Sequence, residues 1–188
     1  MESKYILRNF TEEDFSREVE QCKQQLVKLG YKGVLVKQYV LVLSTKMCTT
    51  MGLCTYLKGW SKFELKLNKA FADTVEDYNA LKDVIMHEVC HTIRGCNNHT
   101  GKWLELVHRV NEEYGYHIQR QASQSMNYTK YKEEHGLGKY RYCIRCKVCN
   151  NSYEYRNRTE LIRQIEEGKQ PTYFCPCCES MNFELEVL

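Results

Sequence analysis

The feature that most constrains this chain is a pair of histidines four positions apart, His87 and His91, with Glu88 directly after the first. In an α-helix, side chains four residues apart lie on one face, about 6 Å from each other, so both imidazoles can bind one metal ion. Zinc lowers the pKa of a bound water, and a carboxylate that takes its proton leaves a hydroxide able to attack a carbonyl group. The pattern therefore predicts a hydrolytic zinc site on a helix; the alternative is a pair of solvent-exposed histidines on an amphipathic helix.

A catalytic zinc ion usually has three protein ligands and leaves a fourth position for water. The candidates for the third ligand follow the motif, and they are Cys96, His99, His108, Glu105, Glu112 and Glu113. We favour His99, because Gly95 predicts a turn that would let His99 fold back towards the first pair. Asp83, four residues before His87, is either a group that orients that imidazole or an acid on the helix surface.

A second metal site is indicated by cysteines that crowd the end of the chain. Six of the 11 cysteines lie there: Cys143, Cys146, Cys149, Cys175, Cys177 and Cys178. The pairs Cys146/Cys149 and Cys175/Cys178 have the spacing of a closed, tetrahedral, structural zinc site. Cys143 and Cys146 form a further CxxC pair, so Cys143 is an alternative ligand. We favour Cys149, because Asn150 and Asn151 predict the turn that follows the second cysteine.

Apolar periodicity predicts an α+β fold. Thr11 and the acidic residues after it predict the start of a helix that ends at Gly30. Short β-branched and alternating segments between Val34 and Leu67 predict about three antiparallel strands. A helix from about Glu76 to Arg94 then carries the histidine pair, and another follows with Trp103 on its core side. A short helix is predicted at Thr159–Ile165, between the cysteine pairs.

We expect three segments: a catalytic domain at 1–118, a basic linker at 119–139 and a zinc-ribbon lobe at 140–188. A lobe of about 50 residues has too small a core to fold without its ion. The net charge of +3 does not by itself indicate nucleic acid. Basic residues nevertheless exceed acidic ones between 119 and 158, and the candidate nucleic-acid contacts are Arg141, Lys147, Arg156 and Arg158. The alternative is a solvated basic surface on a lobe that only stabilises the chain.

The composition is that of a globular protein, with 43% hydrophobic and 27% charged residues. No apolar run approaches the roughly 18 residues that a membrane span needs. The N-terminal residues contain no apolar segment typical of a secretory signal. We therefore expect a monomer in the cytoplasm or nucleoid, or in the nucleus of a eukaryote, where cysteines bind metal rather than form disulfides.

With both sites in view, the chain resembles the SprT-like family, which includes the Spartan-type proteases. The resemblance is carried by Ser44–Met47, Gly52–Cys54, Phe63–Asn68, His87–His91, His99–Trp103 and the terminal CxxC pairs. The first two segments resemble the stretch before the family's active helix. The other four resemble, in order, its last strand, its zinc helix, its later histidine segment and its zinc ribbon. Together they cover roughly residues 20–185.

The resemblance implies His87, His91 and His99 as zinc ligands and Glu88 as the general base. It implies a zincin-like domain, made of an N-terminal helix, a small antiparallel sheet, the zinc helix and a following helix, with a C-terminal zinc ribbon. It also implies cleavage of DNA-associated or DNA-crosslinked proteins, with single-stranded or distorted DNA as an activator.

We therefore expect a zinc endopeptidase with one catalytic and one structural Zn²⁺, whose role is the repair of DNA–protein crosslinks. The alternatives are a non-catalytic, DNA-associated module whose metal sites are structural, and a hydrolase that acts on a non-peptide substrate.

Overall fold

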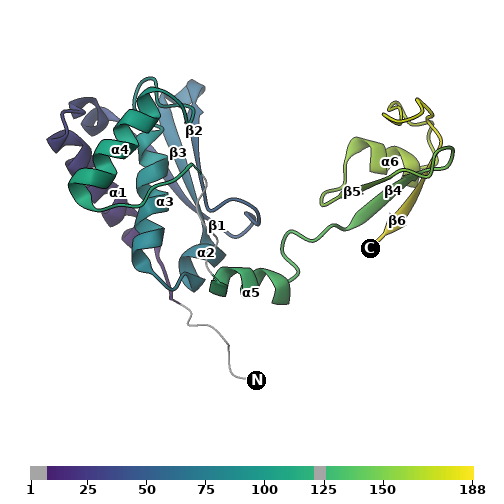
Figure 1. Cartoon of the computed structure of the whole chain (residues 1–188), viewed down its shortest axis with the longest axis horizontal. Helices are drawn as coiled ribbons and strands as arrows, with labels where there is room; N and C mark the ends of the chain where they lie inside the picture. Colours follow the sequence, from purple (N-terminus) through teal and green to yellow (C-terminus); the bar gives the residue numbers. More distant parts are fainter. Residues whose placement is uncertain (1–7, 121–125) are drawn as a thin grey trace. The chain divides into compact units, whose positions relative to one another are not determined.

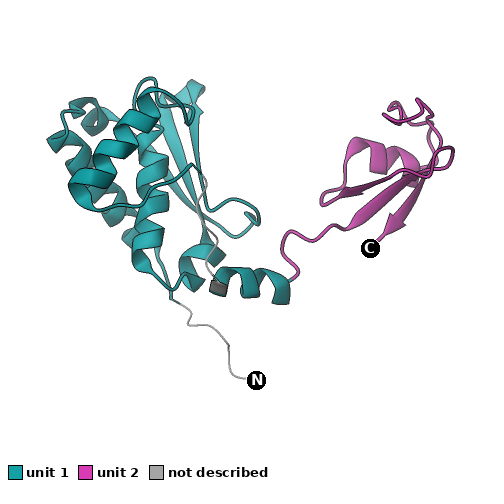
Figure 2. Cartoon of the chain, viewed as in Figure 1, with its two compact units in different colours: residues 1–135 teal, residues 136–188 magenta. Residues whose placement is uncertain are grey.

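The computed structural model describes residues 8–120 and 126–188. The chain forms two compact units, Met1–His135 and Gly136–Leu188 (Figure 2). The predicted linker at 119–139 contains a helix, α5 (Met126–Glu134), which falls within the first unit. Residues 121–125 of that linker lie outside the described part of the chain. Within that part, none of the helices combines the length and apolar character needed to cross a bilayer.

The sheet of the first unit consists of β1 (Tyr39–Ser44), β2 (Gly52–Leu57) and β3 (Lys62–Asn68), in the order β1-β3-β2. Strand β3 pairs antiparallel with β2 but parallel with β1, so the predicted all-antiparallel sheet is wrong for one of its two pairings. Apolar alternation identifies a strand but carries no information about its partner or direction. Two short 3₁₀ helices, Lys32–Val36 and Lys58–Trp60, precede β1 and β3.

Helices α1 (Glu12–Lys28), α3 (Tyr78–Cys90) and α4 (Lys102–Tyr114) lie on one side of this sheet (Figure 1). Their apolar sides share one core with β3, whose Leu65 and Leu67 are fully buried. The predicted cap of α1 is confirmed, because the Thr11 hydroxyl accepts the Asp14 N–H in a capping box.

Helix α3 is shorter than predicted. The Asp77 side chain caps its start, and its last helical residue is Cys90, so His91 occupies the C-cap position. A turn follows, in which the Thr92 hydroxyl donates to the Val89 carbonyl and Gly95 adopts a φ of +89°. The two histidines of the motif therefore belong to the last turn of the helix rather than to its middle.

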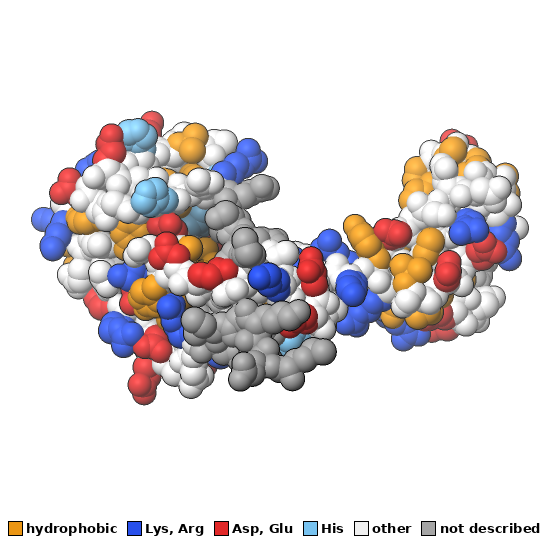
Figure 3. Space-filling model, turned by 60° about the horizontal axis from the view of Figure 1, so that its bottom comes forward, with side chains coloured by type: hydrophobic (Ala, Val, Ile, Leu, Met, Phe, Trp, Pro, Cys, Tyr) orange, Lys and Arg blue, Asp and Glu red, His pale blue; other side chains and the backbone are white. Residues whose placement is uncertain are grey.

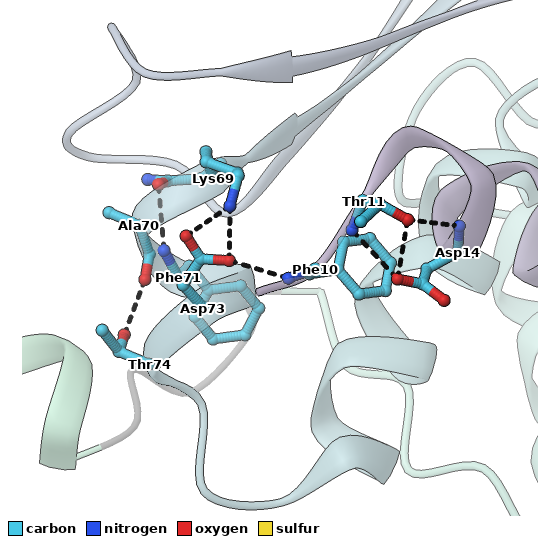
Figure 4. A network of polar contacts seen from close by, with 9 residues as sticks. Phe10, Thr11, Asp14, Lys69, Ala70, Phe71, Asp73 and Thr74 are labelled. Atoms are coloured by element: carbon cyan, nitrogen blue, oxygen red, sulfur yellow. Dashed lines mark hydrogen bonds and ion pairs between the residues drawn. The ribbon is translucent and has the colours of Figure 1, made fainter. Parts of the chain in front are cut away.

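A short helix not predicted from the sequence, α2 (Lys69–Thr74), follows β3 and contacts residues just before α1. The Asp73 carboxylate accepts hydrogen bonds from the Phe10 N–H at 3.1 Å and from the Lys69 ammonium at 2.6 Å (Figure 4). The same figure shows the Thr11 cap, next to Phe10 in the chain. The residue before the Thr11 cap is thus attached to α2. This attachment and the cap together fix the start of α1.

A buried tyrosine attaches helix α5 to the rest of the first unit. The ring of Tyr128 contacts Phe71 edge-on at 5.7 Å, and its hydroxyl accepts a 2.7 Å hydrogen bond from the Asn68 amide. That amide also donates to the carbonyls of Met47 and Thr50, in the loop between β1 and β2. Isolated tyrosines in an otherwise polar segment do not form a periodic apolar stripe, which is why the sequence pattern predicts a linker here.

The second unit contains an antiparallel sheet of β4 (Tyr142–Cys146), β5 (Ser152–Tyr155) and β6 (Phe183–Val187), in the order β5-β4-β6. The predicted short helix is confirmed as α6 (Glu160–Glu166), and the Thr159 hydroxyl caps it. The core is small, with Ile144, Ile162 and Phe183 at its centre.

Candidate metal centres

The three histidines predicted as ligands come together in the first unit. His87 and His91 lie at the end of α3, and His99 lies in the loop before α4. The Nε2 atom of His99 is 2.9 Å from that of His87 and 3.1 Å from that of His91, and the remaining Nε2–Nε2 distance is 3.2 Å. The other candidates for a third ligand, among them Cys96 and His108, are not part of this cluster.

Backbone carbonyls fix the tautomers of two of these imidazoles. The Gln119 carbonyl lies 3.0 Å from Nδ1 of His87, and the Cys96 carbonyl lies 2.6 Å from Nδ1 of His91. A carbonyl oxygen can only accept a hydrogen bond, so both Nδ1 atoms carry the proton and both Nε2 atoms present a lone pair. Lone pairs that face each other at about 3 Å repel unless a cation lies between them.

The geometry fits one zinc ion. A tetrahedral ion with Zn–N distances of about 2.05 Å separates its nitrogen ligands by about 3.4 Å, slightly more than the 2.9–3.2 Å found here. Three imidazoles suit zinc and leave one position of a tetrahedron open. His87, His91 and His99 are thus the residues that would hold a zinc ion.

The indole ring of a buried tryptophan packs against all three histidines. Trp103, on α4, is only 1% exposed, and its ring lies within 4.7–5.6 Å of the three imidazole rings. It stacks on His91, with 17° between the two ring planes. The sequence pattern places Trp103 in the core but does not reveal this contact, because its periodicity is that of any buried residue on an amphipathic helix.

All three imidazoles are held in the neutral form that metal binding requires. Burial, followed by the charges of the two neighbouring histidines, lowers the pKa of His87 to about 4. Burial also lowers the pKa of His91. The pKa of His99 is lowered by burial and then by the charges of His91 and Arg120.

We expect His87 to destabilise the metal-free first unit as the pH falls from 6.5 to about 4, whereas Glu88, whose raised pKa favours protonation in the folded state, acts in the opposite direction. The unfolded chain protonates His87 below pH 6.5, whereas the folded chain accepts that proton only near pH 4, so acid favours the unfolded state. Urea unfolding at a series of pH values, followed by tryptophan fluorescence, measures this directly, because Trp60 and Trp103 both lie in the first unit. A His87→Gln variant should lose less stability than the wild type over this pH range; an equal change in stability would contradict this origin.

Glu88, one residue after His87 on α3, is buried against the sheet edge. Its side chain is next to Gly52, where an added Cβ would lie 2.6 Å from Oε1 of Glu88. Burial raises the pKa of Glu88 to about 8, and a hydrogen bond from the Cys54 backbone partly offsets this. Gly52 and Cys54 belong to β2, an outer strand of the sheet. Sequence reasoning did not predict the contact with Gly52, since a glycine at the start of a strand is read as a turn residue.

Asp83 does not contact His87 directly. Its carboxylate accepts a 2.9 Å hydrogen bond from the His117 N–H, in the segment that follows α4. The end of α4 and the same segment are attached to α1, because the Tyr114 hydroxyl donates to the Gln25 carbonyl and the Tyr116 hydroxyl to the Gln25 side chain.

The second unit brings four cysteines together. Cys146, Cys149, Cys175 and Cys178 have their sulfur atoms within 4.8 Å of one another, and two of the Sγ–Sγ distances are 3.5 Å. A disulfide would need about 2.05 Å, and a tetrahedral zinc site with Zn–S distances of about 2.3 Å needs sulfurs about 3.8 Å apart. The four cysteines therefore fit a structural zinc ion and no disulfide.

The two cysteine pairs have the same backbone geometry. The N–H of Asn150 donates to the Cys146 carbonyl at 2.9 Å, and the N–H of Glu179 donates to the Cys175 carbonyl at 2.8 Å. Asn150 and Glu179 both adopt positive φ angles, of 61° and 58°. The turn predicted at Asn150 is thus present.

The neighbouring cysteines lie outside this cluster. Cys143 is buried in β4, and Cys177 is exposed. The hydroxyl of Tyr153 lies 3.3 Å from the sulfur of Cys175, and this hydrogen bond lowers the pKa of Cys175 to about 6, which favours the thiolate that binds metal.

The four basic residues predicted to contact nucleic acid do not form one group. Arg141 and Arg156 flank the same end of the sheet, because the Arg141 N–H donates to the Tyr155 carbonyl. Lys147 follows the other end of β4, which is roughly 20 Å away at the rise of an extended strand. Arg158 forms a 2.7 Å ion pair with Glu166. Acidic and basic side chains alternate over the visible face of this unit (Figure 3).

No curated protein matches the chain. A sequence model of the SprT-like family matches residues 19–131. This range spans more than half of the 188 residues and includes Glu88 and the three clustered histidines. It also extends into α5, in agreement with the burial of Tyr128 in the first unit. The chain belongs to the SprT-like family.

Proposed function

We propose that this protein is a zinc-dependent endopeptidase that cleaves DNA-associated or DNA-crosslinked proteins. The observation that carries the proposal is the convergence of three Nε2 lone pairs at the end of a helix that also carries, one residue after His87, the buried carboxylate of Glu88. The match to a family of metallopeptidase-like proteins supports it. A structural metal site needs no acid at this position, and burying one costs stability, which argues against a purely structural role.

A zinc ion bound by the three histidines would supply Lewis-acid chemistry for the attack of water on a carbonyl group. Glu88 takes the proton of the attacking water and delivers it to the amine of the leaving peptide. A general base works best when its pKa is near the working pH, and burial moves the pKa of Glu88 in that direction, to about 8.

The substrate would bind along the outer strand β2. A peptide that adds a strand to this edge makes backbone hydrogen bonds and passes Gly52 and Cys54, both of which contact Glu88. Leu53 and Tyr56 on the same strand are 45% and 50% exposed. Recognition through the backbone suits proteins of unrelated sequence.

DNA would bind the second unit at the end of the sheet that carries Arg141 and Arg156. The guanidinium of Arg156 lies 5.2 Å from the centre of the Tyr140 ring, and Tyr140 is 46% exposed. A cation beside an exposed aromatic ring suits phosphate contact together with base stacking. Arg158 is a weaker candidate, because its charge is already paired with Glu166.

The test is cleavage of a basic protein substrate by the zinc-loaded full chain, with the substrate free, on single-stranded DNA and on duplex DNA. We expect fragments when DNA is present, and their loss when 1,10-phenanthroline removes zinc. Mass spectrometry of the fragments identifies the cleaved bonds. If zinc occupies both sites, DNA binds, and the substrate stays intact in every mixture, the non-catalytic alternative holds instead.

A further inference from the structure

The six residues after α4, 115–120, return to α3 and form a segment that we term the strap. Gly115 ends the helix with a φ of +70°, and its N–H donates to the Asn111 carbonyl. The Asn111 side chain then holds Ile118 by two hydrogen bonds: its amide donates to the Ile118 carbonyl at 3.2 Å, and its oxygen accepts the Ile118 N–H at 3.1 Å. Ile118 is only 5% exposed. One side chain thus fixes both polar groups of a buried strap residue.

A second attachment joins the strap to α3. The carboxylate of Asp83 accepts the His117 N–H at 2.9 Å. Asp83 lies one helical turn before His87 and on the same face. Tyr116, beside His117, is 8% exposed and donates its hydroxyl hydrogen to the Gln25 side chain at 2.8 Å. The strap is therefore held on both sides of His117.

The strap ends at the metal centre. Two residues after His117, the Gln119 carbonyl accepts the Nδ1–H of His87 at 3.0 Å. An imidazole can rotate about two side-chain torsions and exists in two tautomers, so its zinc-binding nitrogen is defined only if the other nitrogen is held. The Nδ1–H of His91 donates to the carbonyl of Cys96, only five residues later in the sequence. The Nδ1–H of His87 donates instead to a carbonyl 32 residues away.

We propose that Asn111 and Asp83 are positioning residues for the metal centre, which act on His87 through the strap by fixing the Gln119 carbonyl. Neither side chain is within the cluster of zinc-binding atoms. The strap replaces the direct Asp83–His87 contact that the sequence spacing suggests. The inference rests on the three-histidine site of the proposed function but not on proteolysis.

Zinc affinity is the measurement that tests this. In Asn111→Leu and Asp83→Ala variants of the full chain, competition with a chromophoric chelator should show that zinc binds the histidine site 10–100-fold more weakly, the range expected when a partner behind a ligand is lost. The four-cysteine site in the same chain is an internal reference and should keep its affinity. Asp83→Asn should bind almost as the wild type does, because its amide oxygen can still accept the His117 N–H.

The matched control is Tyr114→Phe, also on α4, which loses a hydrogen bond to the Gln25 carbonyl but leaves the strap untouched. Its zinc affinity should equal that of the wild type. Folded Asn111→Leu and Asp83→Ala proteins that bind zinc as tightly as the control would overturn the proposal. A protein that binds zinc at both sites and cleaves nothing would instead refute the proposed function and leave this inference intact.

A second measurement does not depend on whether the variants fold. Long-range ¹⁵N–¹H NMR spectra of the metal-free wild type report which nitrogen of His87 carries the proton. We expect a single tautomer, protonated at Nδ1. A mixture of tautomers, or protonation at Nε2, would show that the Gln119 carbonyl does not define this ring.

Discussion

Replacing Glu88 by glutamine should lower peptide cleavage about a thousandfold while both metal centres stay loaded, since a positioned general base contributes about 10²–10⁴ in rate. The amide has nearly the same shape as the carboxylate, so the packing against Gly52 is kept, but it cannot take a proton from water. Burial disfavours the charged form of the Glu88 side chain and raises the pKa of Glu88 to about 8. The variant should therefore be at least as stable as the wild type at neutral pH.

Glu18→Gln provides the matched control. Glu18 is also a buried glutamate of the first unit, 6% exposed, but it lies on α1 and accepts its hydrogen bond from Tyr78. This variant should retain activity. Equal cleavage by Glu88→Gln and the wild type, on a DNA-bound substrate and with two zinc ions per chain, would rule out Glu88 as the base.

Replacing Cys175 by serine should unfold the second unit and leave the first one folded. Structural zinc contributes about 10–16 kcal/mol of apparent binding free energy in small domains, and the core around Ile144 and Ile162 is too small to replace it. Limited proteolysis with mass spectrometry should show rapid cleavage throughout 136–188 and a protected fragment that ends near residue 135. Strong chelators should have the same effect on the wild type.

Cys177→Ser is the control, because Cys177 lies between the ligands Cys175 and Cys178 in sequence yet is exposed and outside the cluster. It should resist proteolysis as the wild type does. If Cys175→Ser resists equally, the second unit does not depend on a four-cysteine zinc site, and the ribbon interpretation fails.

The parts of the site that could be predicted from sequence are those that local geometry determines. Residues four apart meet on a helix, so His87 and His91 converge whatever surrounds them. Caps are local too, and the Thr11 hydroxyl accepts a backbone N–H in the first turn of α1, as its sequence predicts. A cysteine pair with the right spacing likewise forms its own turn, as the hydrogen bond from Asn150 to Cys146 indicates.

The parts that could not be predicted depend on contacts between distant segments. The strap reaches His87 through the Gln119 carbonyl, and every residue has a carbonyl, so no residue type marks the one that is used. The parallel pairing of β1 with β3 depends on which strand enters the sheet between the other two. Helix α5 is attached in part through Tyr128, whose polar partner lies 60 positions away in the sequence.

The close approach of Gly52 to Glu88 restricts which residues position 52 can accept. A methyl group added there would meet the carboxylate before it met any other part of the protein, whereas a methyl group at Gly59 would meet nothing within 4 Å. Any side chain larger than hydrogen at position 52 must move the acid group away from the sheet edge. Selection for catalysis would keep glycine at this position, and a lineage that retained only the metal-bound scaffold would be free to lose it.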